Sequence, residues 1–259
     1  MDSIGRQLVC SVALALAVLS ARAETTVSGG NVVGLLRVDS VSTNTIVAVP
    51  WVACSAEGSP IAVSNLVKTA NLTAGDMLYA LDAAGNRFNA WQLVAGEDGV
   101  LGWSAVKQVE MTGVATKTDS AAAATLARGA AGLLSRQHPE AGSFYLCGQY
   151  SSAAATTAIV AGSAGEPRYH LVASPGASDL ALNSLDWTGV DAADRIYVTR
   201  ADGTTVELHY KDATDKWCLN SLEEVGHFYR NVEVPYAGSV SAGTGFWYAS
   251  HGGTPTINW

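Results

Sequence analysis

The side chains that could carry out catalysis in this sequence are scattered glutamates, histidines and cysteines, and their spacing matches no known catalytic pattern. Glu207 with the neighbouring Glu223 and Glu224 could act as the paired acids of a glycosidase, although surface positions are the default for such glutamates. Cys147 and a distant histidine could form a nucleophile and its base, but spacing along the chain does not show proximity. No Gly-x-Ser-x-Gly elbow and no glycine-rich phosphate loop is present. We therefore expect a protein that is not an enzyme and uses no cofactor, with a hydrolase lacking a recognisable motif as the least favoured alternative.

The spacing of possible metal ligands does not predict a metal site either. The histidines form no His-x-x-x-His or His-Glu-x-x-His pair, so zinc is unsupported. Asp76 and Asp194 recur at the same place in two similar stretches, and a repeated carboxylate could be a calcium ligand. Calcium takes about six to eight oxygens, usually from a tight loop, and the acidic residues here are too widely spaced. An aspartate that caps its own turn through a backbone N–H explains the position better, so we expect two turn caps and no metal. The histidines are His138, His170, His209, His227 and His251.

Those two similar stretches, Asn65–Gly85 and Asn183–Gly203, align without a gap and share one layout. The first reads NLVKTANLTAGDMLYALDAAG and the second NSLDWTGVDAADRIYVTRADG. Each has a polar lead-in, an Ala-x-Asp turn, an apolar strand with a tyrosine, and a glycine turn. This repetition predicts two modules of the same plan, in which the matched residues recur for structural reasons. The matched residues are Asp76 with Asp194, Tyr79 with Tyr197, Gly85 with Gly203, and farther along Trp103 with Trp217.

The aromatic residues are the better candidates for binding. The chain has seven tryptophans and nine tyrosines, more than two small cores need if several are exposed. Exposed tryptophan or tyrosine on a sheet face can stack on a sugar ring or bury against a protein, although tryptophan is buried on average. Trp187 and Trp259 have no counterpart in the repeat, and Trp247 stands where the first copy has Leu133. We therefore expect Trp187, Trp259 and Trp247 to contact a ligand.

Alternating apolar residues and turn signals predict strands over most of the chain. MLYAL, RFNAWQLV and VLGWSAVKQVEM predict a meander, with a tight turn at Asp98–Gly99. VVGLLRV and TIVAVPW, on either side of Ser42–Asn44, predict a β-hairpin. An alanine run predicts a short helix near Ser120–Ala127. We expect an all-β, mainly antiparallel fold with at most one or two short helices, built as two tandem β-sandwich- or barrel-like modules over 24–143 and 144–259.

The N-terminus and the composition indicate export. An apolar run, Leu8–Leu19, precedes Ala21-Arg22-Ala23, which is typical of a signal peptide over 1–23 that is cleaved after Ala23. No later stretch is apolar enough for a membrane-spanning helix. A net charge of −8 without a basic stripe argues against nucleic acid and anionic membranes as partners. Export permits disulfides, but the cysteines left after cleavage, Cys54, Cys147 and Cys218, are favoured as buried thiols over a single bridge.

Several motifs together resemble a group of uncharacterised exported bacterial β-repeat proteins, related to surface and adhesin-associated modules. The shared motifs are an apolar strand ending in proline, a Gly-Asp-x-Ile-Tyr-like strand and a terminal Ala-Gly-x-Gly-Phe-Trp-like strand, here TIVAVP and LVASP, AGDMLYALDAAG and AADRIYVTRADG, and AGTGFWY. The resemblance implies a secreted β-rich module and gives no catalytic residue. We expect a surface or extracellular protein with a structural or adhesion role, whose partner is a glycan, another surface protein or itself. The alternative is a carbohydrate-binding module that uses exposed tryptophan and tyrosine.

Overall fold

The computed structural model describes residues 33–39, 43–52, 60–81, 88–107, 116–120, 125–150, 155–176, 178–200, 203–225 and 227–259. The expected signal peptide over 1–23, Cys54 and Gly85 lie outside these ranges. Within them the fold is all-β and mainly antiparallel, which confirms the predicted fold class. No helix in this part of the chain is long and apolar enough to cross a membrane. The helical elements are short: α2 (Val63–Leu66), η2 (Pro139–Ala141) and η3 (Leu182–Ser184).

The first half of the chain packs a six-stranded sheet against a smaller one. Alternating strand residues such as Leu78, Leu93 and Leu134 fill the space between them with Phe144 and Leu146. The large sheet runs in the order β2 (Asn44–Ala48), β11 (Ala131–Ser135), β6 (Met77–Leu81), β7 (Phe88–Ala95), β8 (Leu101–Lys107), β9 (Thr116–Ser120). The smaller elements are β1 (Val33–Val38), β12 (Phe144–Tyr150) and β3 (Trp51–Val52), with β5 (Val67–Lys68) on β12, and the pair β4 (Ile61–Ala62) and β10 (Thr125–Leu126).

The second half is built in the same way around a core that includes Trp217, Phe246 and Tyr248. Its large sheet runs in the order β14 (Arg168–Ala173), β22 (Gly245–Ser250), β17 (Arg195–Thr199), β18 (Thr205–Lys211), β19 (Lys216–Val225), β20 (Phe228–Pro235). The smaller sheets are β13 (Thr156–Ala158), β23 (Thr256–Asn258) and β16 (Asp186–Thr188), and the pair β15 (Leu180–Ala181) and β21 (Ser239–Val240). Counted from the start of each half, the six strands of the two large sheets follow one order. Within the described residues both large sheets are open, with an edge strand at each end.

Three sequence-based expectations are wrong. The boundary expected after residue 143 falls one strand too early, because β12 pairs with β1, β3 and β5 and so completes the first half. The strands on either side of Ser42–Asn44 do not form a hairpin, because β1 pairs with β12 whereas β2 pairs with β11 in the other sheet. The helix expected near Ser120–Ala127 is absent from its described residues, since Ser120 ends β9 and Thr125–Leu126 form β10.

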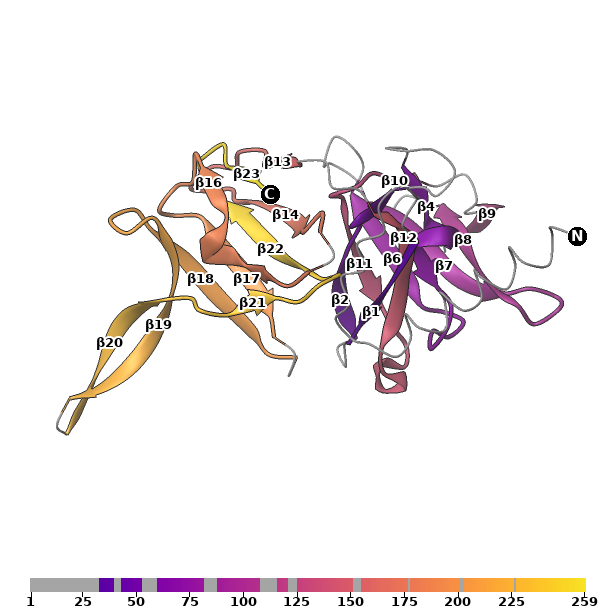
Figure 1. Ribbon diagram of the computed structural model, residues 1–259, viewed down its shortest axis with the longest axis horizontal. Helices are drawn as coiled ribbons and strands as arrows, with labels where there is room; N and C mark the ends of the chain where they lie inside the picture. The colour runs from indigo at the N-terminus through magenta and orange to yellow at the C-terminus, as the bar shows by residue number, and fades with distance from the viewer. Residues whose placement is uncertain are drawn as a thin grey trace, which may run out of the picture.

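The two halves lie side by side along the long axis of the molecule, with β2 of the first half at the junction (Figure 1). The N–H of Ala48 donates to the Gly243 carbonyl at 2.9 Å, and Val47 forms a single antiparallel bridge with Thr244. A small apolar cluster drawn from both halves seals the contact, made of Ile46, Ala48, Ala131 and Ala173 with Leu133, Leu171 and Trp247 packed against it. At the end of the molecule away from the first half, β19 and β20 project from the body as a long ribbon (Figure 1).

Candidate functional site

The glutamates considered as paired acids do not face one another. Glu207 lies on β18, where it pairs with Tyr197 of β17. Glu223 lies on the part of β19 beyond Cys218, where β19 has separated from β18 and pairs with β20. Each carboxylate also has a cation beside it, Arg195 at 3.4 Å from Glu207 and Arg230 at 2.6 Å from Glu223. This arrangement is that of surface ion pairs.

The thiol of Cys218 is not activated. It is buried and donates to the Lys216 carbonyl at 3.7 Å. Burial raises the pKa of the Cys218 thiol, whereas a nucleophilic cysteine needs a lowered one. Cys147 lies half-buried on β12.

The two repeated aspartates are both buried, and each closes its own turn. Asp76 accepts from the N–H of Thr73 at 2.9 Å and from the N–H of Gln137, just beyond β11, at 2.7 Å. Asp194 accepts from the N–H of Asp191 at 3.0 Å and from the N–H of His251, just beyond β22, at 2.6 Å. The same carboxylate therefore ties a turn to the end of the neighbouring strand in both halves. Among the described residues no group of three or more His, Cys, Asp or Glu is placed to hold a metal.

Asp194 has one partner that Asp76 lacks. The hydroxyl of Tyr248 donates to Asp194 Oδ2 at 2.6 Å, whereas the corresponding residue of the first half is Leu134. Burial and the Asp194 carboxylate both raise the pKa of Tyr248, so the phenol stays protonated and remains a donor.

The tryptophans expected to contact a ligand are half-buried and bonded within the fold. Trp187 donates its ring N–H to the Leu182 carbonyl at 2.9 Å and packs edge-on to Trp217 at 5.2 Å. Trp259 donates to the Thr157 hydroxyl at 2.9 Å and packs on the second core. Trp247 lies in the apolar cluster at the junction. Packing within the protein accounts for all three positions.

The matched residues that the structure describes in both copies lie at equivalent structural positions. Tyr79 pairs across strands with Leu133 and Ala90. Tyr197 correspondingly pairs with Trp247 and Glu207. Trp103 and Trp217 are buried in the two cores, and Gly203 has a φ of 82°, a conformation that favours glycine.

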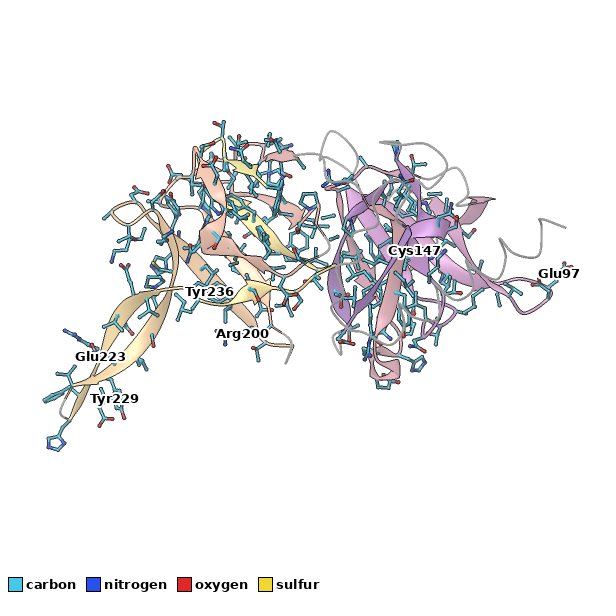
Figure 2. All side chains as sticks on the ribbon, viewed as in Figure 1. Glu97, Cys147, Arg200, Glu223, Tyr229 and Tyr236 are labelled. Carbon is cyan, nitrogen blue, oxygen red and sulfur yellow. The ribbon has the colours of Figure 1, made fainter. Side chains whose placement is uncertain are left out.

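The most exposed apolar surface lies on the ribbon formed by β19 and β20, which sequence reasoning missed. Only Lys216–Cys218 pair with β18, whereas β19 and β20 pair with each other from Cys218–Pro235 out to Val225–Phe228. Among the strands that the structure describes, the sheet beyond Cys218 is therefore two strands wide. We call the segment Leu219–Val234 the arm. Figure 2 shows Glu223 and Tyr229 near its far end, with Tyr236 back at the body.

Four apolar side chains crowd the end of the arm. Phe228 is 80% exposed, Tyr229 and Leu222 are each 68% exposed, and Val225 is 50% exposed. Alternation along the strands places Val225 and Phe228 on one face of the ribbon, and Leu222 and Tyr229 on the other. The end of the arm is therefore apolar on both faces, with the Glu223–Arg230 ion pair two residue pairs inward from Val225–Phe228.

The root of the arm is fixed to the body by polar contacts. The side-chain amide of Asn183 donates to the carbonyls of Trp217 and Tyr236, each at 2.9 Å, and accepts from the Trp217 N–H at 2.8 Å. On the outer face, Lys211 Nζ lies 2.8 Å from Glu233 Oε2. The hydrogen bond and the charge of Lys211 lower the pKa of Glu233. The arm therefore has a root fixed to the body and an exposed apolar end.

In comparisons of this chain with known proteins, no family model, no curated protein and no solved structure matches. Inferences about function therefore rest on the geometry of the arm and the body.

Proposed function

We propose that this chain is an exported, non-enzymatic protein with a structural or adhesive role, and that it makes its contacts through the arm. The observation that carries the proposal is the group of exposed apolar side chains at the end of the ribbon, above all Phe228 and Tyr229. Large exposed aromatic side chains grouped on a projecting element mark interaction sites.

The energetics favour a covered arm. An isolated two-stranded ribbon is marginally stable in water, and this one also exposes apolar groups on both faces. Full burial of one such side chain stabilises a contact by about 1.5–3 kcal/mol. Burying four such side chains contributes enough favourable free energy for a reversible contact, after the free-energy cost of lost translational and rotational freedom is subtracted.

The rest of the chain acts as a base for the arm. Two tandem modules, divided between β12 and β13, give a body that presents the arm at one end of the long axis. The predicted signal peptide over 1–23 would deliver this body outside the cell, where an adhesive or structural protein acts.

A glycan-binding role is the second candidate, and one observation favours it. Tyr169 is exposed on β14, and Tyr197 lies on the same outer sheet face with the Arg195–Glu207 ion pair. Aromatic rings beside charged hydrogen-bonding groups are a surface on which a sugar could stack.

The test uses the mature chain, 24–259, immobilised on beads and measured for adhesion to protein-coated surfaces, its own protein included, and to a glycan array. Replacing both Phe228 and Tyr229 by serine should lower adhesion to protein at least tenfold. Val100→Ser is the matched control, because Val100 is 65% exposed in a turn of the first half and should be neutral. Adhesion to protein that is absent, or that ignores the arm variant, contradicts the proposal. Glycan binding lost in Tyr169→Ala would favour the second candidate.

A further inference from the structure

The outer edge of β20 is open. Among the described strands, β20 pairs only with β19. The N–H of Tyr236 donates to the Trp217 carbonyl, which fixes which backbone groups of β20 bond to β19. Alternation then directs the backbone groups of Tyr229, Asn231 and Glu233 away from β19, toward solvent.

This edge lacks three of the features that usually protect an edge strand, although it carries two charged side chains, Arg230 and Glu233. Natural edges are blunted by lysine, by an internal proline or by a β-bulge. The sequence of β20, FYRNVEVP, has no lysine, and its one proline, Pro235, is the last residue. The pairing of β19 with β20 runs without a register shift. The corresponding edge of the first half has a register shift between Ala105 and Val106, where β8 pairs with β9.

We propose that the open edge of β20 pairs antiparallel with β20 of a second copy of this chain, across a two-fold axis at Asn231. The two six-stranded sheets would then continue into each other. This inference rests on the proposed function, because it names the partner that the arm contacts. A two-fold axis gives a closed dimer, in which both copies use the same surface.

The backbone and the charges select this register. With the axis at Asn231, Asn231 of one chain faces Asn231 of the second chain, and Tyr229 of each chain faces Glu233 of the other. Those positions carry the outward N–H and C=O groups, so about six backbone hydrogen bonds form. An axis at Arg230 would place two guanidinium groups opposite each other, which is destabilising. An axis at Val232 would set Tyr229 against Pro235, which has no N–H to donate.

The same register covers the apolar end of the arm. Phe228 of each chain lies opposite Val234 of the second copy, on the face that leads into the core. Each tip therefore lies beside the root of the other arm, where Val232 and Val234 are already half-buried. A lipid surface fits less well, because Glu223 and Glu224 lie immediately behind the tip and would lose water.

The size of this contact predicts a weak dimer. One pair of eight-residue strands buries less than the roughly 1,200–2,000 Å² of a stable interface. We therefore expect a reversible dimer at micromolar concentrations.

Disulfide trapping tests the register. Facing residues in a hydrogen-bonded antiparallel pair have Cα atoms about 5.5 Å apart, within reach of a disulfide. Mature chain carrying Asn231→Cys should form a covalent dimer on mild oxidation. Asn220→Cys, exposed on β19 one strand away from the edge, should not, and the parent chain gives the background from the native cysteines.

Asn231→Pro gives an independent readout. It removes an N–H that points away from β19, so the ribbon keeps its own hydrogen bonds while the dimer loses two. Sedimentation velocity should show the dimer fraction falling at least tenfold. Absence of trapping at residue 231, together with association unchanged in Asn231→Pro, overturns the β20 dimer. The proposed function survives that result if adhesion still depends on Phe228 and Tyr229, and fails with it if adhesion does not.

Discussion

Replacing Asp194 by alanine should be among the most destabilising single changes in the second half. The side chain is fully buried, and its two oxygens accept three hydrogen bonds. The donors are the N–H of Asp191, the N–H of His251 and the hydroxyl of Tyr248, at 3.0, 2.6 and 2.6 Å. Alanine leaves all three donors without an acceptor and opens a space beside the aromatic cluster.

The magnitude follows from those donors. A buried group left without its partner costs about 1–3 kcal/mol, and water that enters near the surface turn recovers part of this. We expect Asp194→Ala to lower the free energy of unfolding by about 3–5 kcal/mol, a large share of the roughly 5–15 kcal/mol of a typical domain. Tyr248→Phe, which removes one donor and keeps the ring, should cost about 1–2 kcal/mol.

The assay is guanidinium unfolding followed by near-ultraviolet circular dichroism. The signal of the second half comes from Trp187, Trp217 and Tyr248, whose rings lie within 5.2–6.0 Å of one another. Asp212→Ala, in an exposed turn of the same half, is the control and should be neutral. A loss below about 1 kcal/mol in Asp194→Ala would refute the turn-cap argument. A melting temperature of the parent chain that rises with added calcium would refute it independently, because a site that binds only the folded state stabilises it.

Three further perturbations test the arm and the junction. Asn183→Ala removes the amide at the arm root and should lower stability by about 2–3 kcal/mol, with faster amide hydrogen exchange along β19 and β20. The lowered pKa of Glu233 means that its ion pair stabilises the folded arm above the ordinary glutamate value of about 4.3, and that this stabilisation is lost as the pH falls through the lowered pKa. NMR spectra of the arm should therefore change below that ordinary value, and not in Glu233→Gln. Gly243→Val should loosen the junction, because φ is 76° and the new Cβ would lie 2.7 Å from a Val38 methyl, so small-angle X-ray scattering should show a larger radius of gyration.

Local patterns predicted the strands far better than their partners. The meander of β6, β7 and β8 was correct, because alternation marks each strand and short turns such as Asp98–Gly99 force neighbours to pair. β1 was assigned the wrong partner, since its true partner β12 lies more than a hundred residues away. Alternation states which face of a strand is buried, and not which strand lies beside it. The boundary predicted after residue 143 separated β12 from the first half for the same reason, because the distant partner of β12 could not be recognised from the sequence.

The arm could not be located from composition, because exposure there depends on where two neighbouring strands stop pairing. The pairing of β18 with β19 ends at His209–Cys218, while β18 continues along β17 to Thr205, so the outer part of β19 has no second neighbour among the described strands. Phe228 and Tyr229 would be ordinary strand residues if β18 stayed paired with β19. Val225 and Phe228 flank a two-residue connection that begins with glycine, a hairpin signal that sequence reasoning could have used. The number of tryptophans led to the expectation of exposed binding residues. Trp187 and Trp259 instead donate their ring N–H groups to acceptors within the fold.

The internal comparison between the two halves isolates what is special about the arm. Both large sheets have one strand order, and in both a buried aspartate closes the same turn, so the shared plan accounts for stability. The sheets differ at the distal edge, where β8 and β9 pair through a register shift and β19 and β20 pair in unbroken register with a long exposed end. A bulged edge resists strand addition, whereas a straight one invites it. Both kinds of edge occur in one chain on sheets of the same strand order. Replacing β8 and β9 of the first half by the sequence of β19 and β20 should therefore give the first half an edge that pairs with another strand.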